Sequence, residues 1–119
     1  MVVDTNILLY LIKGDHRLQS YLENRQLYIS FITELELLSF KKLTEKEESL
    51  ISYMLEMSTV VEMNAGIKNH VIRLRKLHGF RLPDAIIAAT AAYLDVPLLT
   101  ADKSFKSKAG IDVIIYEVN

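Results

Sequence analysis

The chain contains no cysteine, so disulfides, thiolate-bound metals and thiol nucleophiles are excluded. None of its three histidines stands at metal-ligand spacing from another ligand, and its four glycines form neither a Walker-type loop nor a GxGxxG loop. No serine lies in the strand-to-helix context that a Ser-His-Asp hydrolase needs. No apolar run is long enough to span a bilayer, and the N-terminus lacks the basic region of a signal peptide. We therefore expect a soluble cytoplasmic protein with no membrane association.

Charge is nearly balanced, but it is unevenly distributed along the chain. The net charge of −1 offers no overall attraction to nucleic acid. However, no acidic residue lies between Glu62 and Asp84, and a second basic cluster follows Asp102. These clusters are either solvated helix faces or a rim that binds phosphate, and the sequence leaves both open. The first comprises Lys68, His70, Arg73, Arg75, Lys76, His78 and Arg81, and the second Lys103, Lys106 and Lys108.

Hydrophobic residues make up 50% of the 119-residue chain, enough for the core of one domain covering residues 1–119. Their periodicity predicts alternating strands and helices, and Thr44 with Glu47 three residues later forms a capping-box signature. This alternation favours an α/β fold with a mostly parallel sheet between two helix layers. The predicted strands cover 1–4, 27–32, 59–63, 97–100 and 112–116, and the predicted helices 6–12, 16–24, 33–42, 44–57, 64–78 and 83–94, with a short turn after Asp102.

Four acidic residues stand where an apolar run ends or a helix begins. Asp4 ends the first strand, Glu36 opens the helix after the second, and Asp102 follows the strand at 97–100. Because ligands of open α/β sheets bind beyond the carboxyl ends of the strands, these acids should share one edge. Asp84 begins a helix that leads into strand 97–100, so it should start near the same edge. Such a cluster repels itself unless divalent cations bind, which points to Mg²⁺- or Mn²⁺-dependent phosphoryl chemistry.

Each of the four acids also has a purely structural interpretation as a helix cap or as a partner of a helix dipole. For Glu36 this is a capping box with Thr33. Glu34 competes with Glu36, but helical geometry puts the two about 200° apart, so only one can face a shared site. Four caps at one predicted edge are a less simple explanation than one site. Short polar neighbours could orient the carboxylates or bind metal-bound water, or could be ordinary turn residues: Thr5, Asn6, Ser30 and Thr100.

Three segments together resemble the PIN domain, most closely the small VapC-type ribonuclease toxins. They read VVDTNILLYL, ISFITELELL and LPDAIIAATAAYLDVPLLTADKSF. The resemblance implies a three-layer α/β/α fold and a Mg²⁺- or Mn²⁺-dependent endoribonuclease that hydrolyses RNA phosphodiester bonds with a metal-activated water. It places the family's acids at Asp4, Glu36, Asp84 and Asp102, and favours Glu36 over Glu34. Asp4, Asp84 and Asp102 are then expected to bind the metal, and Glu36 to be a ligand or a base.

The resemblance also implies partners. A VapC-type protein is the toxin of a type II toxin–antitoxin pair and is often a homodimer. Its antitoxin would offer a cation to the acidic cleft and apolar side chains to a groove along helices 6–24 and 33–57. The apolar residues of these helices could equally all be core or dimer contacts. Two other functions stay open, namely a housekeeping RNA-processing nuclease and a non-catalytic module that binds RNA or protein. Intact acids at all four positions argue against the non-catalytic module. Apart from the resemblance, the basic clusters suggest RNA contacts: Arg73, Lys76 and Arg81, which lie closest in sequence to the helix start at Asp84, and Lys103 next to Asp102.

Overall fold

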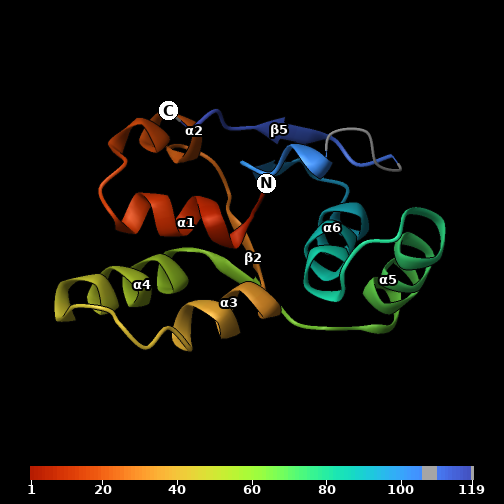
Figure 1. Cartoon of the computed structure of the whole chain (residues 1–119), viewed down its shortest axis with the longest axis horizontal. Helices are drawn as coiled ribbons and strands as arrows, with labels where there is room; N and C mark the ends of the chain where they lie inside the picture. The colour runs from red at the N-terminus through yellow and green to blue at the C-terminus, as the bar shows by residue number, and fades with distance from the viewer. Residues whose placement is uncertain (106–109, 119) are drawn as a thin grey trace.

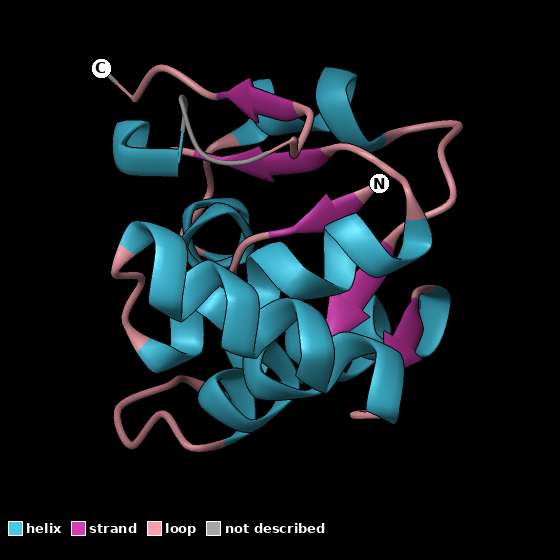
Figure 2. Ribbon diagram, turned by 90° about the vertical axis from the view of Figure 1, so that its right-hand side faces the viewer, coloured by secondary structure: helices cyan, strands magenta, loops and turns pink. Residues whose placement is uncertain are grey.

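The computed structural model describes residues 1–105 and 110–118, so Lys106 and Lys108 of the second basic cluster lie outside the described residues. The strands form a five-stranded sheet in the order β3-β2-β1-β4-β5, and every neighbouring pair is parallel. They lie side by side and twist progressively across the sheet (Figure 2). All carboxyl ends therefore meet at one edge. The strands are β1 Val2–Val3, β2 Tyr28–Ser30, β3 Thr59–Val61, β4 Leu98–Thr100 and β5 Val113–Ile115.

Helices cover both faces of this sheet, with α5 and α6 on one side and α1, α3 and α4 on the other (Figure 1). The two residues of β1 show why two cores result. Val2 packs in the cluster of α5 and α6, whereas Val3 packs in the opposite cluster, because successive strand residues face opposite ways. The predicted three-layer α/β/α fold is confirmed. The helices are α1 Thr5–Ile12, α2 Gln19–Leu22, α3 Phe31–Leu38, α4 Glu45–Met57, α5 Ala65–His78 and α6 Leu82–Leu94, with short 3₁₀ turns η1 His16–Leu18 and η2 Lys103–Phe105.

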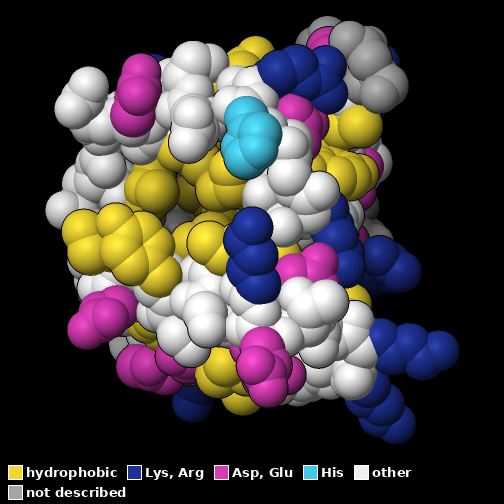
Figure 3. Space-filling view, turned by 90° about the vertical axis from the view of Figure 1, so that its left-hand side faces the viewer, with side chains coloured by type: hydrophobic (Ala, Val, Ile, Leu, Met, Phe, Trp, Pro, Cys, Tyr) yellow, Lys and Arg dark blue, Asp and Glu magenta, His cyan; other side chains and the backbone are white. Residues whose placement is uncertain are grey.

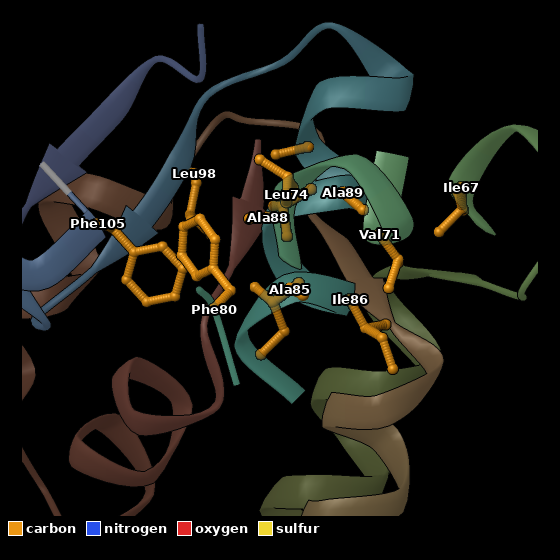
Figure 4. Packing of buried hydrophobic residues seen from close by; sticks show 13 residues of the cluster. Ile67, Val71, Leu74, Phe80, Ala85, Ile86, Ala88, Ala89, Leu98 and Phe105 are labelled. Carbon is orange, nitrogen blue, oxygen red and sulfur yellow. The ribbon is translucent and has the colours of Figure 1, made fainter. Parts of the chain in front are cut away.

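The middle of helix α6 is buried on all sides, since every residue from 85 to 91 is buried. Its alanines make this possible, because small side chains let the helix lie close to β1, to β2 and to α5. Figure 4 shows Ala88 and Ala89 within the buried cluster that also contains Leu74 of α5 and Leu98 of β4. A Cβ added at Gly66 of α5 would clash with the Tyr93 ring of α6, so this glycine permits the close approach. The packing holds the N-terminus of α6 in a defined place.

Two helix boundaries differ from the sequence-based predictions. The helix predicted at 33–42 begins at Phe31, because Ser30 caps it by accepting a 3.3 Å hydrogen bond from the Ile32 N–H, and it ends at Leu38. Thr33 therefore lies inside α3, and a capping box between Thr33 and Glu36 does not form. The helix predicted at 16–24 is split into η1 and α2.

Two other predictions from capping chemistry are confirmed. Thr44 and Glu47 exchange hydrogen bonds of 3.0 and 3.1 Å at the start of α4. Gly79 ends α5 in the left-handed conformation at φ 66°.

Over the part of the chain that the structure describes, no helix has the length and apolar character needed to cross a membrane.

Candidate functional site

The four acids line a single cavity of about 520 Å³ at the carboxyl edge of the sheet. Each arrives on a different element. Asp4 follows β1, Glu36 lies in α3, Asp84 lies in the first turn of α6, and Asp102 comes two residues after β4. Glu34 does not line the cavity. The fold thus brings together the four acids that the sequence singled out, and it selects Glu36 rather than Glu34.

Asp4 is the most deeply buried of the four, with 6% of its surface exposed. Its carboxylate accepts a 2.6 Å hydrogen bond from the Thr100 hydroxyl, and its side chain does not cap α1. Burial raises the pKa of Asp4 above its ordinary value, and the negative charges of Asp84 and Glu36 raise it further. The hydrogen bonds from Thr100 and from the Thr5 N–H oppose this rise without cancelling it. Asp4 is therefore a carboxylate whose negative charge the native protein only partly compensates.

Thr100 links two of the acids. Its hydroxyl donates to Asp4 and accepts a 3.0 Å hydrogen bond from the Asp102 N–H. Asp102 in turn accepts a 2.9 Å bond from the Ser104 N–H, so it caps η2 and lines the cavity at the same time. Asp102 therefore makes the capping bond of the structural interpretation and also faces the cavity, as the site interpretation requires.

Glu36 is held by a neighbour from α1. Its Oε1 lies 2.6 Å from the hydroxyl of Thr5, and that same hydroxyl lies 3.0 Å from the hydroxyl of Thr33. Thr33 is a contact that the sequence reasoning missed, because it was assigned to a helix cap. Its position three residues before Glu36, on the same face of α3, was the available signal.

Asp84 has a basic neighbour on the cavity rim. The Nε of Arg81 lies 3.4 Å from Asp84 Oδ2, and 85% of the Arg81 side chain is exposed. Asn6 also lines the cavity and is exposed, whereas Ser30 is buried as the cap of α3 and does not line it. The remaining lining residues were not foreseen from the sequence: Leu9, Ser39, Phe40, Pro83 and Ile87.

Of the four basic candidates, only Arg81 lines this cavity. Arg73 instead lines a second cavity with Asp95 and Pro97, where α6 ends and β4 begins, so it lies towards the opposite edge of the sheet. Lys76 is exposed on α5, and Lys103 pairs with Glu117 at 3.3 Å. Closeness in sequence to Asp84 was a poor guide here, because a helix carries residues away from its end by about 1.5 Å per residue.

The donor chemistry of the cavity fits a hard divalent cation. Four carboxylates supply only oxygen, as Mg²⁺ and Mn²⁺ prefer. The pKa of Asp4 is raised first by burial and then by the charges of Asp84 and Glu36, and a bound cation would stabilise the ionised carboxylate against both. Within residues 1–105 and 110–118, however, no three acidic or histidine side chains are gathered in an arrangement that could hold a metal ion. A cation would therefore have to draw the carboxylates together or reach some of them through water, as Mg²⁺ commonly does.

Comparisons with known proteins identify the family to which this fold belongs. The family model of the PIN domain matches residues 1–111. A toxin–antitoxin complex from Klebsiella pneumoniae contains a chain that is 31% identical, with 98% of both chains covered and a TM-score of 0.84. For VapBC-1 from nontypeable Haemophilus influenzae the identity is 26%, the coverage 96% of both chains and the TM-score 0.77.

The fold extends to more distant structures. VapBC2 from Rickettsia felis, solved with a DNA fragment from its promoter, shares 23% identity over 98% of both chains at a TM-score of 0.86. At 23% identity, this similarity is evidence for the fold alone. No curated protein matches the chain. The family model covers all four acids and nearly the whole described chain, and the chain therefore belongs to the PIN domain family.

Proposed function

We propose that this protein is a Mg²⁺- or Mn²⁺-dependent endoribonuclease. The observation that carries the proposal is the meeting of Asp4, Glu36, Asp84 and Asp102, from four separate segments, around one cavity at the carboxyl edge of the sheet. Membership of the PIN domain family supports the same activity. A divalent cation bound there would lower the pKa of a nearby water and would neutralise charge on the scissile phosphate.

The residues of the chain have distinct roles in this proposal. Asp4, Asp84 and Asp102 would hold the cation, and Thr100 fixes Asp4 relative to Asp102 through its two hydrogen bonds. Glu36 has Oε1 occupied by the Thr5 hydroxyl, which leaves Oε2 to orient the attacking water or to accept its proton. Arg81, at the rim, binds a phosphate of the RNA backbone.

The direct test is cleavage of RNA by the purified protein with Mn²⁺ and with EDTA. Asp4→Asn keeps the size of the side chain and removes its charge, and it should abolish cleavage. Asp95→Asn is the matched control, since Asp95 is exposed and lies in the left-handed conformation that asparagine tolerates. No cleavage by the wild-type protein, or equal cleavage by Asp4→Asn and the wild type, would refute the proposal.

We infer further that the protein is the toxin of a toxin–antitoxin pair acting on RNA in the cytoplasm. Similarity to the Klebsiella toxin–antitoxin complex supports this. So does an apolar recess for a partner: α1, α2 and α4 present a face on which hydrophobic side chains surround a hollow (Figure 3). A cavity of about 540 Å³ there includes Leu8, Leu11, Leu22, Met54 and Met57 among its lining residues. An antitoxin peptide would place apolar side chains in it and a cationic side chain in the acidic cavity.

Co-expression separates the toxin from a housekeeping nuclease. Growth arrest by the wild-type chain, absent with Asp84→Asn and relieved by a small neighbouring gene, is the expected result. Cleavage of RNA without growth arrest and without a copurifying partner would favour the housekeeping nuclease. A scaffold that only binds RNA or protein would show no carboxylate-dependent Mn²⁺ binding. Light scattering of the purified chain tests the homodimer that the family resemblance implies.

A further inference from the structure

Thr33 is a fully buried polar residue close to the acidic cavity that the proposed roles leave unused. None of its surface is exposed, and it does not line the cavity. Its hydroxyl nevertheless lies 3.0 Å from the hydroxyl of Thr5, which itself lies 2.6 Å from Glu36 Oε1. Three side chains from α1 and α3 are therefore joined in one row.

The number of available protons determines which hydroxyl is the donor in each of these hydrogen bonds. A threonine hydroxyl has one proton to donate, whereas an ionised carboxylate can only accept. The short contact to Glu36 therefore takes the Thr5 proton. The contact between the two threonines is then a hydrogen bond only if Thr33 donates to Thr5. The row reads Thr33 to Thr5 to Glu36, with each hydroxyl donating towards the carboxylate.

A second buried helical threonine shows that this arrangement is specific to the site. Thr90 of α6 is as deeply buried as Thr33, but its hydroxyl donates to the Ile86 carbonyl at 2.8 Å. That bond, to the carbonyl four residues earlier, is the usual way in which a helix satisfies a threonine. Thr33 instead contacts a different helix, so its hydroxyl connects α3 to α1 next to Glu36.

We propose that Thr33 is a positioning residue for Glu36. By donating to Thr5, it fixes the side-chain rotamer of Thr5 and directs the Thr5 proton onto Glu36 Oε1. Glu36 is thereby held in one orientation, with Oε2 free in the cavity. This inference rests on the proposed nuclease function for its effect on catalysis, but the hydrogen-bonded row itself does not depend on that function.

The catalytic test compares three variants. Thr33→Val replaces the hydroxyl by a methyl of similar size and should lower kcat for Mn²⁺-dependent RNA cleavage about fivefold, as expected for the loss of one hydrogen bond. KM should not change, because Thr33 does not line the cavity. Thr33→Ser keeps the hydroxyl and should restore kcat. Thr90→Val removes a buried helical hydroxyl elsewhere and should leave kcat unchanged.

A double-mutant cycle separates positioning from a general structural role. If Thr33 acts only through Thr5, adding Thr33→Val to Thr5→Val should lower kcat no further. Multiplicative losses in the double variant would overturn the proposal. So would equal losses in Thr33→Val and Thr90→Val. If Thr33→Val does not fold, Thr33→Ala removes the same hydroxyl and takes its place in the cycle.

A measurement without RNA or metal tests the row directly. Three-bond NMR couplings to the Thr5 methyl carbon report its χ1 rotamer. We expect a single rotamer in the wild type, Thr33→Ser and Thr90→Val, and averaging between rotamers in Thr33→Val. A single Thr5 rotamer in Thr33→Val would overturn the proposal. Should the wild-type protein cleave no RNA, the nuclease function fails, and these couplings still decide whether Thr33 positions Thr5.

Discussion

The hydrogen bond between Thr100 and Asp4 allows a quantitative prediction about stability. Both residues are buried, and the bond is 2.6 Å long and made to a carboxylate. Thr100→Val keeps the shape of the side chain and removes the donor. Hydrogen bonds to charged groups are worth about 1.5–3 kcal/mol, so we expect a loss of about 2 kcal/mol in the free energy of unfolding at pH 7. For a domain of this size that corresponds to a thermal midpoint lower by about 8 °C.

Two comparisons isolate the charged hydrogen bond from the rest of the substitution. In an Asp4→Asn background the bond is made to a neutral amide oxygen, so Thr100→Val should cost only about 1 kcal/mol. Lowering the pH should also shrink the cost in the wild-type background, because the carboxylate becomes protonated as the pH falls through the raised pKa of Asp4. Thr90→Val controls for the loss of a buried threonine hydroxyl.

The assay is urea unfolding of the metal-free protein at pH 7 and pH 5, followed by circular dichroism. The expected result is a destabilisation by Thr100→Val that is largest at pH 7 and about half as large in the Asp4→Asn background. An equal cost in both backgrounds would refute the reasoning, because it would show that the charge of Asp4 has no part in the bond.

Three further predictions follow from individual side chains. Glu36→Gln should remove Mn²⁺-dependent cleavage and keep or raise the thermal midpoint, because it relieves the repulsion that helps to raise the pKa of Asp4. Glu34→Gln is its control, and equal activity in the two variants would argue against a role for Glu36. Arg81→Ala should weaken RNA binding and lower the salt slope by roughly 0.7, whereas Arg73→Ala should do neither, since only Arg81 lines the acidic cavity. Asp15→Asn should lower stability at neutral pH, because hydrogen bonds hold the pKa of Asp15 at about 2. That difference should be complete above the ordinary pKa of aspartate, near 4, and should vanish as the pH falls to about 2, which acid unfolding of both proteins will show.

Much of the fold was predictable because its signals are local. The apolar runs that end at Asp4 and before Asp102 mark strands, and Thr44 and Gly79 mark the start of α4 and the end of α5. One such local signal was misleading: it placed the start of α3 at Thr33, whereas the helix begins at Phe31. Ser30 and Thr33 are both good N-caps, and the choice between them depends on where β2 stops pairing with β3, which a local pattern does not report.

The four acids of the site were also predictable, since parallel strands bring their carboxyl ends to one edge whatever the details of packing. The positions of the basic residues relative to the acidic cavity were not predictable in this way. Arg73 and Arg81 belong to the same basic segment of the sequence, yet they line different cavities because Arg73 lies within α5 and Arg81 lies beyond its end. Their separation follows from how α5 and α6 pack, not from their spacing.

The succession of strands and helices along the chain, the two-sided core and the four acids at one edge could be read from the sequence, because each depends on periodicity or on a residue at the end of an element. The side chains that hold those acids could not be read in this way. Thr5 reaches Glu36 across 31 positions of sequence, and Thr100 reaches Asp4 across 96. Such partners are set by the register of β1 beside β4 and by the packing of α1 on α3. These contacts join segments distant in the chain, and no local pattern encodes their distance or direction.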